Sequence, residues 1–124
     1  MVGIDIVFVP RIKEQLNKEK FCDKILNSVE KEYVITKKNA NEDVKAKSVA
    51  GFFAAKEAIL KAFQVGITNG YGFLDITINH DEFGAPITML SDKLNNLLKL
   101  KGYKNIHVSI SHDGDYATAI AILN

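Results

Sequence analysis

Runs and alternations of hydrophobic residues along the chain predict five β-strands. The first is apolar and β-branched except for Asp5, and Pro10 closes it, so we expect a strand buried in the core. Apolar and polar residues alternate before a turn-forming stretch at 80–86, which leads into a second short strand, and this predicts a hairpin. The expected strands are Val2–Val9, Leu74–Asn79, Ile87–Leu90, Ile106–Ser111 and Tyr116–Leu123.

Helical spacing of apolar residues predicts helices between the first strand and the hairpin. Two short helices are expected within residues 11–38, with Ser28 placed to cap the second. Asn41 is followed by two acidic residues, which is typical of the start of a helix. The apolar pattern then predicts one long helix that runs to about Phe63 or Gln64.

A last helix and the order of the elements indicate the fold class. Ser91 caps this helix and Gly102 ends it. The resulting order, β-α-α-α-β-β-α-β-β, predicts an α+β fold with a small sheet packed against the long helix. The chain has 124 residues, of which 47% are hydrophobic and 25% charged, so we expect one folded domain over residues 1–124.

The charge balance and the cysteine count argue against several classes of protein. The 16 basic and 15 acidic side chains leave a formal net charge of +1, so no overall field marks a nucleic-acid-binding protein. Cys22 is the only cysteine, which excludes an internal disulfide and a thiolate metal cluster. The chain opens on a strand-like segment without a basic leader or a membrane-length apolar run, so we expect a cytoplasmic protein that has no membrane partner.

An acidic residue within the first strand is the first sign of chemistry. A carboxylate in an apolar strand is costly to desolvate unless a cation or hydrogen-bond donors meet it, so Asp5 calls for a partner. On the long helix, Phe53, Glu57 and Lys61 are spaced four apart and share one face. If this helix packs across the first strand, Asp5 and Glu57 could hold a divalent cation. Magnesium takes one or two protein carboxylates and completes its shell with water and phosphate oxygens.

The same three residues also have plainer interpretations. Asp5 could instead cap a neighbouring helix. Glu57 and Lys61 could form a surface ion pair that contributes about 0.3–0.5 kcal/mol. What favours the site over the surface pair is the unusual position of Asp5.

The histidines differ in their sequence context. His112 ends the segment Ser109–His112, where a strand passes into a loop, and it could contact a phosphate, transfer a proton or be an exposed loop residue. His80 and His107 have no such context, and we interpret both as structural. The chain contains neither a glycine-rich phosphate loop nor a G-x-S-x-G motif, so direct displacement at phosphorus is favoured over covalent catalysis.

Three segments carry a joint pattern: VGIDIV at the N-terminus, GFFAAKEAILKAF on the long helix and VSISHDGDYATAIAI near the C-terminus. In this order they resemble the holo-(acyl-carrier-protein) synthases of the 4′-phosphopantetheinyl transferase superfamily, over nearly the whole chain. The resemblance implies that fold. It also implies an enzyme of fatty acid biosynthesis that transfers 4′-phosphopantetheine from coenzyme A to a serine of apo-acyl carrier protein, giving holo-acyl carrier protein and 3′,5′-ADP.

By matched position, the resemblance implies a catalytic set of four residues. Asp5 and Glu57 correspond to the family's magnesium ligands, with manganese as a substitute ion. Lys61 corresponds to a lysine that contacts the coenzyme phosphates. His112 corresponds to a histidine near the pyrophosphate and the 3′-phosphorylated nucleotide.

The resemblance further implies coenzyme contacts and an assembly. Gly84 and Pro86 match a G-x-P turn that packs against the nucleotide end, and Phe53 is grouped with them as a coenzyme contact. The family's small enzymes are homotrimers that hold each coenzyme between two protomers, an assembly that suits a short chain.

Two positions depart from the family pattern. Phe52 stands where the family often has an arginine, and Phe83 stands where a polar residue usually precedes the G-x-P turn. Two contacts to the nucleotide phosphates are therefore missing from the pattern, and the affinity for the coenzyme is in question. Lys45 or Lys47, earlier on the same helix, is a candidate source of the missing charge.

The resemblance also implies an acidic partner, acyl carrier protein. We predict that it docks on the helix after Pro10, centred on Arg11, because that segment presents several basic side chains. Since the segment also carries acidic residues, a solvated mixed-charge face fits it equally well. Lys13, Lys18, Lys20 and Lys24 are the other basic residues, and Glu14, Glu19 and Asp23 the acidic ones.

Other functions remain open at this point. A metal-dependent phosphohydrolase would use the same carboxylates, lysine and histidine. A coenzyme-binding module without transferase activity would fit the departures at Phe52 and Phe83. For the transferase, either Glu57 or a water molecule of the metal's shell could accept the proton of the serine.

Overall fold

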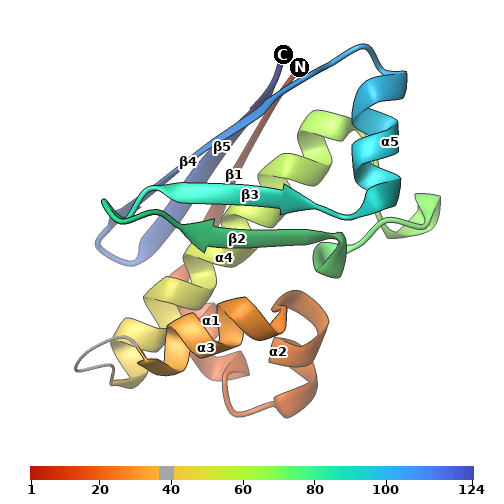
Figure 1. Cartoon of the computed structure of the whole chain (residues 1–124). Coiled ribbons are helices and arrows are strands. Elements are labelled where there is room, and N and C mark those ends of the chain that lie inside the picture. Colours follow the sequence, from red (N-terminus) through yellow and green to blue (C-terminus); the bar gives the residue numbers. More distant parts are fainter. Residues whose placement is uncertain (37–40) are drawn as a thin grey trace.

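The computed structural model describes residues 1–36 and 41–124, apart from the side chain of Glu19. The described elements form an α+β fold in which one long helix, α4, runs past a three-stranded sheet and a two-stranded hairpin (Figure 1). Its strands are β1 Val2–Phe8, β2 Ile76–His80, β3 Pro86–Leu90, β4 Ile106–Asp113 and β5 Tyr116–Leu123. Its helices are α1 Val9–Gln15, α2 Glu19–Ile25, α3 Ser28–Thr36, α4 Glu42–Phe63 and α5 Asp92–Leu100, with 3₁₀ turns η1 Ile67–Asn69 and η2 Phe73–Asp75.

Both sheets are antiparallel. The larger sheet has the strand order β1-β5-β4, and β2 pairs with β3 as the predicted hairpin. In the larger sheet Asp5 lies opposite Ala119, and His112 lies opposite Ala117. Helices α1–α3 gather at one end of α4, and the two chain termini lie side by side at the other end of the molecule (Figure 1).

The close packing of β1 on α4 depends on a residue without a side chain. A Cβ atom at Gly3 would lie 1.9 Å from the carbonyl oxygen of Ala58 and 2.7 Å from the backbone nitrogen of Ala62. The facing strand β5 also presents small residues, since Ala117, Ala119 and Ala121 are buried. Small residues on both elements therefore let the strand and the helix approach closely.

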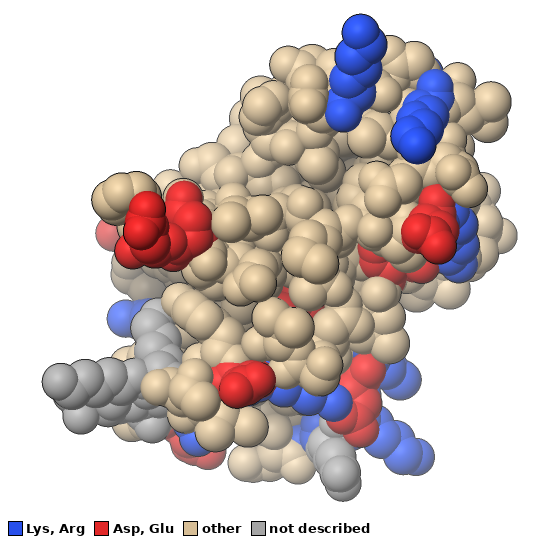
Figure 2. Space-filling model, viewed as in Figure 1, with Lys and Arg blue, Asp and Glu red and all other residues tan. Residues whose placement is uncertain are grey.

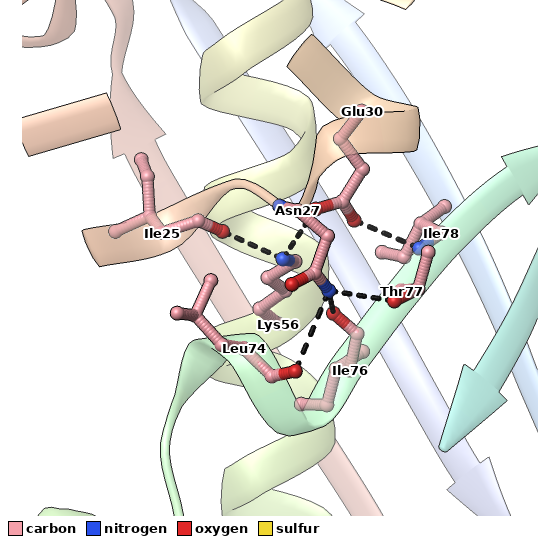
Figure 3. A network of polar contacts seen from close by, with 8 residues as sticks. All are labelled: Ile25, Asn27, Glu30, Lys56, Leu74, Ile76, Thr77 and Ile78. Carbon is pink, nitrogen blue, oxygen red and sulfur yellow. Dashed lines mark hydrogen bonds and ion pairs between the residues drawn. The ribbon is translucent and has the colours of Figure 1, made fainter. Parts of the chain in front are cut away.

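A buried ion pair links α4 to α3 and the hairpin (Figure 3). Lys56 Nζ lies 2.6 Å from Glu30 Oε1 and donates to the carbonyl oxygen of Ile25 at 2.6 Å, and both charged side chains are fully buried. The other carboxylate oxygen of Glu30 accepts from the backbone N–H of Ile78 at 2.8 Å. Burial lowers the pKa of Lys56, while the charge and hydrogen bond of Glu30 act in the opposite direction.

Asn27 completes this network. Its backbone N–H donates to Glu30, and its side-chain amide donates to the carbonyl oxygen of Ile76 at 2.9 Å and to Thr77 Oγ1 at 2.6 Å. The connection between α2 and α3 is thus fixed to the start of β2. Through this connection the core ion pair fixes the position of the hairpin relative to α4 (Figure 3).

The α+β fold, the hairpin and the long helix were predicted correctly, and Asn41 accepts from Val44 N–H as the expected N-cap. The helix count before the hairpin was one too low. Residues 11–38 were expected to hold two helices, but α1, α2 and α3 lie there, and residues 37 and 38 are outside the described part of the chain. Pro10 lies in the first turn of α1 instead of merely closing the strand, because its fixed φ and missing N–H suit that turn.

Three smaller predictions were also wrong. Ser28 is the first residue of α3 and not its cap, and Leu74 belongs to η2 and not to the hairpin. Strand β1 is buried on one face only, because nothing among the described residues covers the side chains of Ile4 and Ile6, which are each 65% exposed. A run of apolar residues alone does not distinguish a core strand from one that keeps an apolar outer face.

Replacing Gly3 by alanine tests the close approach of β1 to α4. We expect the variant to lower the free energy of unfolding by at least about 3 kcal/mol, because the new Cβ would overlap with helix backbone that cannot give way. Urea denaturation followed by circular dichroism measures the change. The matched control is Gly72→Ala, where a Cβ meets nothing within 4 Å. Similar losses in both variants would contradict the packing argument.

Candidate active site

The close packing of β1 on α4 brings three predicted site residues together. Lys61 Nζ lies 2.9 Å from Asp5 Oδ1 and donates to the carbonyl oxygen of Ile4 at 3.2 Å. The Asp5 side chain is only 16% exposed, and Thr118 Oγ1 donates to its backbone carbonyl at 2.8 Å. Asp5 thus meets the cation that its position in an apolar strand calls for. Lys61 forms its ion pair with Asp5, whereas the sequence placed it beside Glu57.

Asp5 and Glu57 line one cleft. This cleft, which we call the carboxylate cleft, has a volume of ≈ 420 Å³. Its other lining residues are Ile6, Val7, Phe8, Arg11, Ile12, Gln15, Phe21 and Phe53. Two carboxylates from neighbouring elements therefore face a common space, with a wall that is largely apolar.

The surroundings of Glu57 disfavour the ionised form of its side chain. Partial burial is the largest cause that raises the pKa of Glu57, and the nearby carboxylate of Asp5 raises it further. The Lys61 ammonium acts in the opposite direction but does not cancel these effects. The two acids are accompanied by Lys61, which pairs with Asp5, and by Arg11, which lines the cleft.

The donor set suits a hard divalent cation that is completed by a ligand. Among the described residues, no group of three or more His, Cys, Asp and Glu side chains is placed to hold a metal. Asp5 and Glu57 alone supply two carboxylates, which matches the small number of protein ligands that magnesium takes when substrate phosphates fill its shell.

A second cleft lies further along α4, which we call the histidine cleft. It has a volume of ≈ 430 Å³ and contains three residues that the sequence grouped with the coenzyme: Gly84, Pro86 and His112. The remaining lining residues are Tyr33, Val44, Lys47, Ser48, Gly51, Phe52, His80 and Ile110. Residues from α3, α4, the hairpin and β4 thus meet at this cleft.

His112 is fixed against α4. Its Nε2 lies 2.9 Å from the carbonyl oxygen of Lys47, which only accepts, so this nitrogen carries the proton and Nδ1 has none in the neutral ring. Gly51 makes room for the ring, since a Cβ there would lie 3.1 Å from His112 Cε1. The sequence placed His112 in a loop. It lies instead in β4, which continues to Asp113.

Sequence reasoning missed an aromatic wall of the histidine cleft. His80, interpreted as structural, stacks on Tyr33 with ring centroids 4.2 Å apart, and Phe52 packs edge-on against both rings. Phe52 is almost fully buried. The only sequence signal for His80 is its position four residues before Gly84 in the hairpin turn, and no local pattern reveals Tyr33.

The other predicted positions fall in different places. Phe53 lines the carboxylate cleft, between Phe21 and Phe73. Phe83 is 86% exposed and does not line the histidine cleft. His107 is exposed on β4. None of the described helices is both long and apolar enough to cross a membrane.

A model of the 4′-phosphopantetheinyl transferase superfamily matches residues 1–121 of this chain. The chain belongs to this superfamily. It is 42% identical over 125 residues to the holo-(acyl-carrier-protein) synthase of Campylobacter hominis, covering 99% of this chain and 96% of that protein. The transferase fold predicted by the three sequence segments is therefore confirmed.

Solved structures support this membership of the transferase superfamily. The Helicobacter pylori holo-(acyl-carrier-protein) synthase in complex with coenzyme A superimposes with a TM-score of 0.83 and 36% identity over the whole of both chains. The corresponding synthase of Neisseria meningitidis gives a TM-score of 0.86 at 28% identity, covering 99% of this chain and 96% of that one. The two clefts thus lie in a scaffold shared with a protein that binds coenzyme A.

Proposed function

We propose that this transferase moves the 4′-phosphopantetheine group of coenzyme A to a serine of apo-acyl carrier protein, in fatty acid biosynthesis and in the cytoplasm. The observation that carries the proposal is that Asp5 and Glu57 line one cleft, with Lys61 paired to Asp5. The coenzyme A complex of the Helicobacter pylori relative supports the choice of donor. The Campylobacter relative's name supports the choice of acceptor.

A divalent cation is part of this proposal. Asp5 and Glu57 would hold magnesium, or manganese in its place. When bound, the ion offsets negative charge on the pyrophosphate as the bond to phosphorus breaks. Lys61 adds a fixed positive charge beside Asp5 and neutralises part of the carboxylate pair.

We assign the nucleotide part of coenzyme A to the histidine cleft. Gly51 and Phe52 line that cleft and Glu57 lines the other, so the clefts are separated by about 9 Å or less along α4. This separation suits a ligand that joins a pyrophosphate to a nucleotide. His112 faces the nucleotide side and steadies phosphate oxygens there, with its ring orientation set by the carbonyl of Lys47.

The reaction is a displacement at the phosphorus that bears pantetheine. The serine Oγ forms the new P–O bond, and the bond to the leaving 3′,5′-ADP breaks. Glu57 is our candidate acceptor of the serine proton, because its carboxylate lines the cleft where the serine would attack.

Removing either carboxylate tests the proposed function. Asp5→Ala and Glu57→Gln should each lower transfer by at least about 100-fold, because the cation would lose one of two protein ligands. The assay incubates protein, coenzyme A, magnesium and apo-acyl carrier protein, and mass spectrometry detects the phosphopantetheine-sized gain of the carrier. Near-normal transfer by either variant would refute the site. Release of phosphate without a gain would indicate a hydrolase, and neither product would indicate a binding module.

A stability measurement separates lost chemistry from lost folding. A carboxylate whose pKa is raised in the folded protein destabilises the fold at pH values above its ordinary pKa of 4.5. Glu57→Gln should therefore melt at a higher temperature than the parent at pH 7. The difference should shrink as the pH falls toward 4, where Glu57 is protonated. A lower melting temperature of Glu57→Gln than of the parent at pH 7 would contradict the electrostatic argument.

We also propose that acyl carrier protein docks beside the carboxylate cleft, on the surface around Arg11. Arg11 lines that cleft, and Lys13 is paired with Asp43 at 2.8 Å. The basic segment expected on one helix is divided between α1 and α2. On the face in Figure 2, acidic and basic side chains are intermixed over this helical end, so local charges rather than a broad basic patch would select the partner.

Charge reversal tests the docking surface. Arg11→Glu should lower the rate of carrier modification about tenfold at low salt, because it places a negative charge where an acidic partner approaches. The rate should also become less dependent on ionic strength. Lys101→Glu, the same charge change at the exposed end of α5, is the matched control and should keep the parental rate. An unchanged salt dependence in Arg11→Glu would refute this docking surface.

We further propose that three copies assemble through the outer face of the three-stranded sheet. This face exposes a contiguous set of apolar side chains, and soluble proteins rarely leave such a face uncovered. The exposed residues are Val2, Ile4, Ile6, Phe8, Tyr116, Ile120 and Ile122. His112 also borders a smaller cleft on this side, with Ile6 and Tyr116, which suits a coenzyme held between two copies.

The assembly is tested by mass in solution. Sedimentation of the parental protein should give three times the chain mass of 13.8 kDa. Ile4→Lys should dissociate the trimer, because each interface would bury an unpaired ammonium. Ile67→Lys, at an isoleucine that is 76% exposed on η1, should leave the mass unchanged. A monomeric parent at micromolar concentration would exclude this assembly.

A further inference from the structure

The histidine cleft contains one lysine that the transferase proposal does not use. Lys47 is the only lysine or arginine among the described residues that line this cleft. Lys45, the other candidate from the sequence, lines a different cleft with Cys22 and Leu26. Residues two apart on a helix point about 200° away from one another, so the structure separates the two lysines.

The ammonium group of Lys47 is available for a ligand. The structure gives Lys47 no ion pair with any described residue, although Asp43 lies one turn earlier on α4. Asp43 is already paired with Lys13 at 2.8 Å. The hydrogen bond from Lys13 and its charge lower the pKa of Asp43, and the charge of Lys47 makes a smaller contribution. The carbonyl oxygen of Lys47 holds His112, so the lysine backbone is part of the cleft wall.

Because position 52 is a phenylalanine, it supplies no positive charge to the histidine cleft. The Phe52 ring is buried and packs edge-on against Tyr33 and His80, so this position contributes an apolar wall to the cleft and no charge. An anionic ligand in the histidine cleft would thus meet two histidines and one lysine. Lys47 supplies the one ammonium group among the described residues that line this cleft.

The position of Lys47 along α4 limits which phosphate of the coenzyme its side chain can reach. Lys47 lies 10 residues before Glu57 and 14 before Lys61, which corresponds to about 15 and 21 Å along α4. A single lysine side chain does not span that distance, so Lys47 and Lys61 serve different anionic groups. If the pyrophosphate lies at the carboxylate cleft, the anion near Lys47 is the phosphate on the nucleotide ribose.

We propose that Lys47 binds the 3′-phosphate of coenzyme A and makes this chain select the 3′-phosphorylated coenzyme. The inference rests on the proposed transferase function and adds a specificity-determining residue to it. Lys47 acts on the ground state, since the 3′-phosphate takes no part in bond breaking. Its contribution therefore appears in KM and not in kcat.

The experiment compares two donors, coenzyme A and 3′-dephospho-coenzyme A, with the parental protein, Lys47→Ala and Lys45→Ala. Lys47→Ala should raise the KM for coenzyme A about tenfold, in line with the loss of one charge-assisted hydrogen bond at a solvent-accessible site. The KM for the dephosphorylated donor should stay within about twofold of the parental value. The alanine keeps the backbone carbonyl that holds His112 and favours the helix.

The control and the donor pair make each outcome decisive. Lys45→Ala removes the same charge from the same helix and should change neither KM. Equal increases for both donors in Lys47→Ala, or the same increase in Lys45→Ala, would overturn the proposal. If the parental protein transfers from neither donor, the proposed function itself fails. If it transfers from both donors with equal KM, the function stands and 3′-phosphate selection is refuted.

Discussion

The contact between β1 and α4 is the constraint on which the site depends. Gly3 lies against the helix backbone where any side chain would collide with Ala58. Two residues further along the strand, Asp5 points to the same side and meets Lys61. The distance between strand and helix therefore fixes the distance between the acid of the strand and the charged residues of the helix. A looser contact would leave a folded protein with its carboxylates apart.

Two adjacent residues of helix α4 place their side chains on different sides of the helix. Lys56 enters the core and pairs with Glu30, whereas Glu57 lines the carboxylate cleft. Because a buried ion pair offsets its desolvation cost only when its geometry is well satisfied, the Lys56–Glu30 pair restricts how α3 and the hairpin pack on α4. These same elements carry the aromatic and turn residues of the histidine cleft, so a buried ion pair in the core helps to fix the shape of a surface site.

The sequence predicted what depends on local pattern and on residues with unusual positions. The long helix and the hairpin followed from periodicity and capping, and the isolated acid Asp5 indicated that β1 and α4 could share a site if they packed together. It missed the extra helix because short segments around Pro10 carry weak periodicity. It also missed the contact of Tyr33 with His80, since these rings come from elements 47 residues apart in sequence. No periodicity within either element encodes such a tertiary contact.

The charges around the carboxylate cleft also bear on the proposed binding of a cation and a phosphate. Asp5 and Glu57 carry two negative charges when ionised, and Lys61 neutralises one of them. Partial burial is the main cause of the raised pKa of Glu57, and the nearby Asp5 carboxylate disfavours its ionisation further. A divalent cation would reverse the sign of the site and so create an attraction for a pyrophosphate. Cation and phosphate would then stabilise each other in the cleft, so that each is bound more tightly in the presence of the other.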